Sequence, residues 1–289
     1  MDINWFPGHM AKALREIKDH LKLVDLVIET CDARIPDSSR NPELSKLIGQ
    51  KPRILVLNKA DLADTRVTAA WIAHYQSRQI TALSCVSTDR KDLNALVRTI
   101  QEYGRDKSER AAARGRLFRP IRVMVAGIPN TGKSTLINTL CGRKLAVTAD
   151  KPGITRHMNW IRTGGQIELL DSPGVLWPKL DGRDSQVHLA ATGAIRDEVL
   201  PIEEVASDTM KKLIQAYPQL IEKRFGLADH TLPIHDLIAA AALGRGCLLS
   251  GGRPDISRFS RLFLDEFRSG KIGRISLEEP RIRTAVQSD

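Results

Sequence analysis

The sequence has little that would anchor the chain in a membrane or cross-link it. No apolar run approaches the ~18 residues that a transmembrane helix needs, so a membrane-spanning protein is not expected. The four cysteines, Cys31, Cys85, Cys141 and Cys247, form no Cys-x-x-Cys pair and indicate neither a zinc site nor a disulfide framework. The opening Met1-Asp-Ile-Asn-Trp5 lacks the features of a signal peptide or an Arg-rich transit segment. We therefore expect a cytoplasmic protein.

Aromatic residues are also scarce. They make up 4% of the 289 residues, and no RNA-recognition signature with stacked aromatics is present. Basic residues, by contrast, outnumber acidic ones by 44 to 34, which gives a formal net charge of +10. This charge favours a polyanionic partner, although it does not distinguish RNA from DNA or an acidic membrane. The length allows two domains, each with its own core.

A glycine-rich stretch in the middle of the chain carries the clearest chemistry. The segment Gly127-Ile-Pro-Asn-Thr-Gly-Lys-Ser134 follows the apolar run 121–126 and precedes a helix-like stretch. Strand, glycine-rich loop and helix in this order form a P-loop, in which backbone N–H groups face a phosphate. Lys133 is expected to reach the β- and γ-phosphates and Ser134 to hold Mg²⁺. The predicted nucleotide contacts here are Asn130, Thr131, Gly132, Lys133, Ser134 and Thr135.

A second motif, Asn58-Lys59-Ala60-Asp61, closes the strand-like run 53–57. Such a motif at a strand end suits guanine, because the Asp61 carboxylate only accepts hydrogen bonds and meets the N1–H and amino donors of that base. Adenine has an acceptor at N1 and would leave the carboxylate unpaired. We therefore predict that Asn58, Lys59 and Asp61 bind the base, although a four-residue match alone also fits a solvated loop.

The last guanine contact is expected after the next strand-like run, Ile80 to Val86. Such contacts are usually made by backbone amides, here within Ser84-Cys-Val-Ser-Thr88. Counting back from Leu93 favours Val86 and Ser87 over Ser84.

Two motifs after the P-loop complete the expected metal site. Asp171-Ser-Pro-Gly174 follows the strand-like run 167–170, where a Walker-B aspartate would approach Mg²⁺, here through water. The Gly174 amide would then meet the γ-phosphate. Between the two motifs, Thr155 of Pro152-Gly-Ile-Thr155 would supply a switch hydroxyl to Mg²⁺, or it is a surface threonine.

The order of these motifs is guanine reader, P-loop, switch threonine and DxxG, whereas an ordinary GTPase has the guanine reader last. Five segments spread along the chain are distinctive: Trp5-Phe-Pro-Gly-His-Met10, Asp32-Ala-Arg-Ile-Pro36, Gly127-Ile-Pro-Asn-Thr-Gly-Lys-Ser134, Asp171-Ser-Pro-Gly-Val-Leu-Trp-Pro178 and Gly246-Cys-Leu-Leu-Ser-Gly-Gly252. Together they resemble the YlqF/RbgA family of circularly permuted GTPases. The resemblance implies an α/β fold: a circularly permuted P-loop GTPase domain over 1–178, with a mostly parallel sheet and helices on both faces. A small all-helical domain that binds RNA or the ribosome would follow over 179–289.

The resemblance also implies a function. Members of this family assist maturation of the large ribosomal subunit, so we expect an assembly factor that hydrolyses GTP with Mg²⁺. It would bind GTP or GDP, a large-subunit precursor and its rRNA as a monomer, without a membrane, and leave after hydrolysis. The alternative is an RNA-binding module in which nucleotide is mainly a conformational ligand. A membrane or signalling GTPase fits least, since no lipidation motif is present.

The catalytic group is not evident from the DxxG motif. Small signalling GTPases carry a water-orienting Gln where this chain has Val175, which has no hydrogen-bonding group. Slow hydrolysis without the particle is therefore expected. The resemblance offers His9 as the catalytic residue, although a lone loop histidine also fits a structural role and His157 lies nearer Thr155. It also offers a potassium ion held by Asn130, which alternatively is a turn residue.

Apolar periodicity predicts helices at 11–24, 68–75 and 93–103 and strands at 25–31 and 80–86, with 103–122 as a mobile basic connector. After the DxxG motif it predicts helices around 210–217, 233–245 and 256–268. In the last of these, Arg258, Arg261 and Arg268 share one face and are candidate RNA-backbone contacts. Arg34 is either a phosphate or RNA contact or an ion-pair partner of Asp32.

Overall fold

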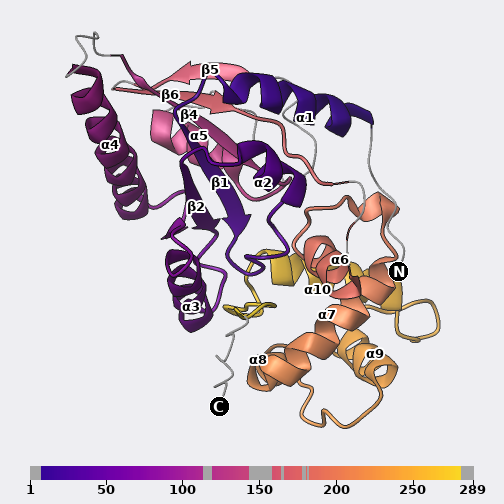
Figure 1. The fold of residues 1–289 in the computed structure, drawn as a ribbon. Coiled ribbons are helices and arrows are strands. Elements are labelled where there is room, and N and C mark those ends of the chain that lie inside the picture. Colours follow the sequence, from indigo (N-terminus) through magenta and orange to yellow (C-terminus); the bar gives the residue numbers. More distant parts are fainter. Residues whose placement is uncertain are drawn as a thin grey trace, which may run out of the picture.

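A six-stranded sheet forms the centre of the first half of the chain in the computed structural model (Figure 1). The structure describes residues 8–112, 119–142, 158–163, 166–177, 180 and 182–280. The strands are β1 (Leu26–Asp32), β2 (Arg53–Asn58), β3 (Thr81–Cys85), β4 (Ile121–Gly127), β5 (Asn159–Arg162) and β6 (Ile167–Asp171). Their order is β3-β2-β1-β4-β6-β5, and all neighbours are parallel except β5 and β6.

Helices cover both faces of this sheet, as the apolar strands require. The helices on one face are α1 (Gly8–Leu21), α2 (Pro42–Ile48) and α3 (Thr65–Gln76), and those on the other are α4 (Arg90–Ala112) and α5 (Lys133–Cys141). Successive side chains of β1 point to opposite faces of the sheet. Val27 and Cys31 pack against α1, α2 and α3, whereas Leu26 and Ile28 pack against α4 and α5. The predicted α/β class, with helices on both faces of a mostly parallel sheet, is thus confirmed.

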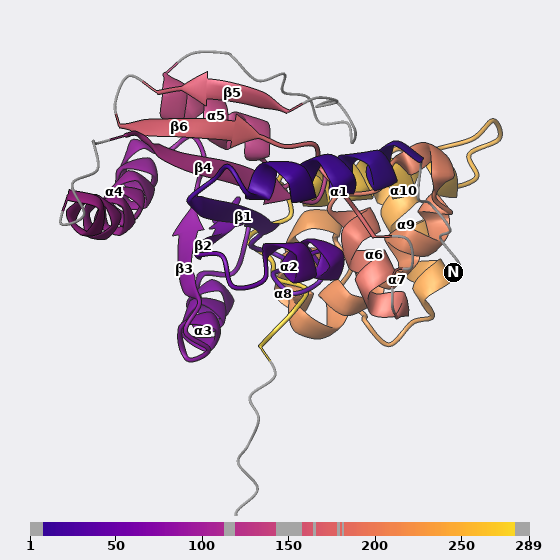
Figure 2. The same cartoon turned by 45° about the horizontal axis from the view of Figure 1, so that its top comes forward.

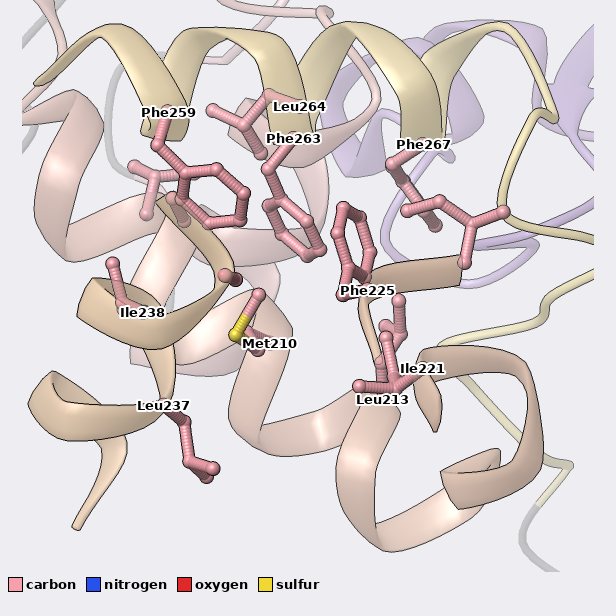
Figure 3. Close-up of a cluster of buried hydrophobic side chains, with 14 of the residues drawn as sticks. Met210, Leu213, Ile221, Phe225, Leu237, Ile238, Phe259, Phe263, Leu264 and Phe267 are labelled. Atoms are coloured by element: carbon pink, nitrogen blue, oxygen red, sulfur yellow. The ribbon is translucent and has the colours of Figure 1, made fainter. Parts of the chain in front are cut away.

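Helices alone follow the DxxG motif in the described part of the chain. They are α6 (Arg183–Ala191), the short 3₁₀ helix Asp197–Val199, α7 (Ile202–Ala216), α8 (Pro218–Phe225), α9 (Ile234–Gly244) and α10 (Ile256–Arg268). These helices gather beside the sheet (Figures 1 and 2). Their core contains an aromatic cluster in which Phe225 lies 5.7 Å from both Phe259 and Phe263, between ring centroids (Figure 3).

The sheet with α1 to α5, here called the sheet half, is joined to α6 to α10, the helical half, by apolar packing and by residues 271–280. Leu189 of α6 belongs to the same buried cluster as Met10 of α1 and Trp177. After α10, the return segment, residues 271–280, runs back toward α3, where the Glu278 carbonyl accepts from the Trp71 indole at 3.0 Å (Figure 1). The helical half is therefore packed directly on the sheet half.

Several elements differ from the sequence-based expectations. The expected connector 103–122 is helical up to Ala112. Tyr103 donates to the Asp25 carbonyl at 3.2 Å, and Gly104 packs closely against Ile121. A Cβ on Gly104 would lie 1.8 Å from the Ile121 side chain, and these contacts fix this part of the chain against the sheet. The expected helices and strands otherwise appear with shifted ends. The elements that periodicity did not predict are α2, α6, α8, β5 and the 3₁₀ helix Asp197–Val199, each at most nine residues long.

Candidate functional site

The carboxyl ends of the parallel strands bring the separated motifs to one edge of the sheet. Asp32 pairs with Asn58 across β1 and β2, and Asn58 pairs with Cys85 across β2 and β3. On the other side of β1, Thr30 lies opposite Gly127, where the P-loop begins. In an open parallel sheet, the crevice outside these strand ends is where ligands bind.

The P-loop makes a tight turn between β4 and α5. Asn130 and Gly132 have left-handed φ angles of 60° and 85°, which asparagine tolerates and glycine adopts freely. A Cβ on Gly127 would lie 2.5 Å from the Thr30 carbonyl oxygen, so this position accepts no side chain without a shift. The local sequence thus builds the curled backbone that binds a phosphate at a helix N-terminus.

Lys133 and Asp171 face a common buried space. Burial lowers the pKa of Lys133 to about 8, partly offset by Asp171, and the amine donates to the Ile128 carbonyl at 2.7 Å. Burial raises the pKa of Asp171 to about 6, with Lys133 acting in the opposite direction. Oδ1 of Asp171 is buried and has no hydrogen-bond partner among the described residues. An orphaned carboxylate oxygen suits a hard cation such as Mg²⁺.

The predicted guanine reader contacts the P-loop directly. Nδ2 of Asn58 donates to the Thr131 carbonyl at 2.7 Å, and Nζ of Lys59 donates to the Asn130 carbonyl at 2.5 Å. Lys59 also lies 3.3 Å from Asp32. The folded chain therefore joins two motifs that are far apart in sequence, and Asp61 is exposed at the same edge.

The loop after β3 joins this group through a side chain. Oγ of Ser87 donates to Oδ1 of Asn58 at 2.7 Å, and the Val86 amide donates to Asp92 at 2.8 Å. Ser84 lies within β3, whereas Val86 and Ser87 follow its end. The favoured register thus places Val86 and Ser87 at the strand end, beside the guanine reader.

The DxxG motif lies against the P-loop. A Cβ on Gly174 would come 2.8 Å from the backbone of Pro129 and 3.0 Å from Nζ of Lys133. The Val175 amide donates to the Gly127 carbonyl at 3.3 Å, and its side chain is buried. Ser134 and Thr135 lie in the first turn of α5.

Asn130 links the P-loop to the helical half. Its side-chain amide nitrogen lies 3.2 Å from the Thr192 carbonyl oxygen and 3.4 Å from that of Gly193, just after α6. These acceptors fix which end of the amide faces α6. The sequence did not indicate this contact, because Thr192 and Gly193 belong to no motif.

Two predicted residues fall outside what the structure describes. Thr155 lies outside the described residues. His9 is in the first turn of α1, but its side chain also lies outside the description.

The structure identifies the partners of two arginines. For Arg34 the sequence left two alternatives open, and for Arg268 the predicted role is wrong. Arg34 is buried and pairs with Asp32 in a bidentate ion pair, which settles its two alternatives in favour of the ion pair. Arg268 was expected on an exposed face with Arg258 and Arg261. It instead pairs with Asp197 and donates to the last carbonyls of α6, so it is not a free RNA contact.

Among the described residues, no group of three or more His, Cys, Asp or Glu side chains has the arrangement of a metal site. None of the described helices is long and apolar enough to cross a bilayer.

Comparisons with known proteins agree with this arrangement. A family model described as 50S ribosome-binding GTPase matches residues 122–226, a segment that begins after the guanine reader. "Ribosome biogenesis GTPase A" of Priestia megaterium is 44% identical over 97% of this chain and 98% of that protein. The protein of the same name from Bacillus pumilus is 43% identical over 97% of this chain and 99% of its own length.

Solved structures extend the similarity to three dimensions. GNP-bound YlqF from T. maritima matches with a TM-score of 0.67 and 27% identity, over 93% of this chain and 99% of that one. A GDP-bound YlqF structure matches with a TM-score of 0.68 and 26% identity, over 93% of this chain and 100% of that one. With the permuted motifs gathered at one sheet edge, these likenesses show that the chain belongs to the ribosome biogenesis GTPase A family of circularly permuted GTPases and is itself a GTPase.

Proposed function

We propose that GTP or GDP binds along the carboxyl edge of the sheet, with its phosphates in the P-loop and guanine against Asp61. The observation that carries this is the pair of hydrogen bonds from Asn58 and Lys59 to P-loop carbonyls. They bring the base-reading motif beside the phosphate-binding motif despite their reversed order in the chain. Val86 and Ser87 would complete the base pocket, since Ser87 already holds Asn58.

We propose that Mg²⁺ is held by Ser134, Thr155 and, through water, Asp171. The buried, unpartnered Oδ1 of Asp171 and the position of Ser134 at the start of α5 support this. Bound Mg²⁺ would neutralise charge on the β- and γ-phosphates during hydrolysis. Lys133 would reach the same phosphates, and the amide of Gly174 would meet the γ-phosphate.

Hydrolysis needs a group that orients the attacking water, and Val175 is buried and cannot do so. We propose His9 for this role, because an imidazole can hold or polarise a water molecule. Asn130 is the proposed ligand of a potassium ion that supplies further positive charge. Replacing potassium with sodium should then slow phosphate release, and equal rates in both salts would leave Asn130 as a link to α6.

We propose that the polyanionic partner is a precursor of the large ribosomal subunit, bound through the helical domain. The description of the matching family model and the net charge of +10 support this choice. On the helical half, Arg258 and Arg261 are exposed. We place the domain boundary after residue 178, where the DxxG segment leads into the helices.

GTP is proposed to favour particle binding and GDP to favour release. Loss of the γ-phosphate would free Thr155 and Gly174 and shift the segment that leads to α6. The test measures particle affinity at fixed salt with GDP and with a non-hydrolysable GTP analogue, alongside phosphate release with and without the particle. We expect about 5–150-fold tighter binding with the analogue. Equal affinities would reject the switch and favour a module for which nucleotide is mainly a conformational ligand.

A further inference from the structure

A series of buried polar contacts runs from the last turn of α10 to the P-loop. Nη1 of Arg34 donates to the Phe267 carbonyl at 3.2 Å, and the guanidinium lies 5.0 Å from the centroid of the Phe267 ring. The same guanidinium binds Asp32 through Nε at 2.9 Å and Nη2 at 2.8 Å. Asp32 lies 3.3 Å from Nζ of Lys59, which donates to the Asn130 carbonyl. Arg34 and Lys59 therefore share one carboxylate.

The pair at the centre of this series is isolated from solvent. The side chains of Arg34 and Asp32 are 1% and 3% exposed, and that of Lys59 is 22% exposed. Burial alone would raise the pKa of Asp32, but Arg34 and Lys59 outweigh it and hold the pKa well below its ordinary value. Asp32 is therefore charged, and a buried charge that loses one partner draws more strongly on the other.

We propose that Arg34 is a positioning residue for the guanine reader. By neutralising Asp32, Arg34 leaves Lys59 directed at the P-loop, and tight GTP or GDP binding therefore depends on the docked end of α10. This inference rests on the nucleotide site proposed above. Without Arg34, Lys59 is drawn toward Asp32 and away from the Asn130 carbonyl, which loosens the joint between the guanine reader and the P-loop.

The return segment, residues 271–280, hydrogen-bonds to the loop after β1, which contains Arg34, and to the loop after β2, which contains the guanine reader. The Leu277 amide donates to the Arg34 carbonyl at 2.8 Å, and the Ile275 amide donates to the Leu62 carbonyl at 2.9 Å, one residue after the guanine reader. Oγ of Ser276 accepts from the Asp64 amide at 3.2 Å. The helical half thus supports the base-reading end through the backbone as well as through Arg34.

The test uses the full chain and measures the Kd for GDP in the presence of Mg²⁺, with KM and kcat for GTP. Arg34→Met should weaken GDP about tenfold, the usual effect of losing a hydrogen bond that involves a charged group. KM should rise similarly while kcat stays within about twofold, because Arg34 contacts none of the described residues that are proposed to hold Mg²⁺ or to orient the water. Adding Asp32→Asn to Arg34→Met should restore GDP affinity to within about threefold of wild type, since a neutral amide no longer attracts Lys59.

Arg40→Met is the matched control. Arg40 lies in the same loop, is largely buried and pairs with Glu29 at 3.2 Å instead of with Asp32. Its loss should lower Tm but leave the Kd for GDP unchanged. If Arg34→Met does not fold, Arg34→Gln and Arg34→Gln with Asp32→Asn replace it with the same expectations.

Three results would overturn the inference. Wild-type GDP affinity in a folded Arg34 variant would show that Arg34 does not act on the site. A further loss on adding Asp32→Asn, instead of a recovery, would show that the two residues act separately. If the wild-type chain does not bind GDP, the proposed nucleotide site is wrong. This result differs from an error about Arg34 alone, in which the wild type binds GDP and the Arg34 variant binds it equally well.

Discussion

Lys133 and Asp171 show how burial tunes single residues at the phosphate end. Each charge is disfavoured by loss of water, so the pKa of the amine falls to about 8 and that of the carboxyl rises to about 6. A phosphate beside Lys133 would raise the pKa of the amine, and a cation beside Asp171 would lower that of the carboxyl, so each would favour the charged form further. Both shifts are consistent with the proposed nucleotide and Mg²⁺ sites.

The raised pKa of Asp171 makes Mg²⁺ binding depend on pH. Below about pH 6 the carboxyl holds a proton that Mg²⁺ must displace, so the Mg²⁺-dependent part of GDP binding should weaken as pH falls from 7.5 to 5. One pH unit below the pKa leaves about a tenth of the group ionised, so we expect about a tenfold loss. Titrating GDP with and without Mg²⁺ at both pH values measures it. The same pH dependence in Asp171→Asn would assign it to another group.

Asp61 should determine the choice of base. Asp61→Asn should weaken GTP and improve xanthosine triphosphate, because the 2-oxo group of xanthine accepts a hydrogen bond from the new amide. The loss for GTP should be about 1–3 kcal/mol, as for an unpaired buried polar group. Competition binding measures it, with Asp64→Asn as control, because Asp64 caps α3 and asparagine also caps well. Equal binding of ATP and GTP by the wild type would contradict the role of Asp61.

His9 and Lys133 should separate catalysis from binding. Lys133→Ala should abolish tight nucleotide binding, whereas His9→Ala should retain the Kd for GDP and lower phosphate release on the ribosomal particle by about 100-fold or more. His20→Ala, at the other end of α1, is the control and should change neither quantity. Unchanged hydrolysis by His9→Ala on the particle would show that another group orients the water.

At the scale of elements, α10 serves two purposes. Phe259 and Phe263 fill the core of the helical half (Figure 3). At the end of the helix, the Phe267 carbonyl accepts from Arg34, and Arg268 donates to the last carbonyls of α6. Carbonyls at a helix end have no partner within the helix, so they are natural acceptors for these arginines. The carboxyl-terminal ends of α6 and α10 therefore make the polar contacts that join the helical half to the edge of the sheet.

The approach of the DxxG segment to the P-loop gives a prediction for Gly174→Ala. The new Cβ would lie 2.8 Å from the Pro129 backbone, so the segment must move away and its amide no longer reaches the γ-phosphate. Affinity for a non-hydrolysable GTP analogue should fall about tenfold, and that for GDP by less.

Gly244→Ala in α9 is the matched control for this substitution. A Cβ at Gly244 would meet its nearest neighbour at 3.9 Å, an ordinary contact. The control should bind both nucleotides as the wild type does. Equal losses for the analogue and for GDP in Gly174→Ala would indicate a general distortion of the P-loop instead.

At the scale of the whole molecule, nucleotide binding and docking of the helical half should stabilise each other. GDP should slow hydrogen exchange of the Ile275 and Leu277 amides, because they donate to Leu62 and Arg34, in the two loops beside the proposed guanine site. Amides of α9, which packs within the helical core, should change less. Exchange measured by mass spectrometry with and without GDP tests this, and equal protection of both segments would indicate a global effect.

Much of the nucleotide edge was readable from the sequence because the P-loop and Asn58–Asp61 are local patterns. Glycine spacing fixes where the backbone can curl, and the apolar runs fix which residues end buried strands. The permuted order followed from the order of the motifs, and the family followed from the resemblance of the five distinctive segments; both are confirmed. Short elements such as α2 and β5 were missed, because seven and four residues carry too little periodicity to stand out.

Local motifs are enough to identify the chemical groups at the sheet edge: a P-loop lysine, an Asn-Lys-x-Asp motif and a DxxG motif. The residues that support these groups come from distant parts of the chain and are found only once it is folded. Arg34 could have faced solvent. Its acceptor, the Phe267 carbonyl, lies 233 positions further along the chain and reaches Arg34 only because α10 packs beside it. Burial then turns that contact into a specific one, because a charge removed from water must bind whichever partners the fold places beside it.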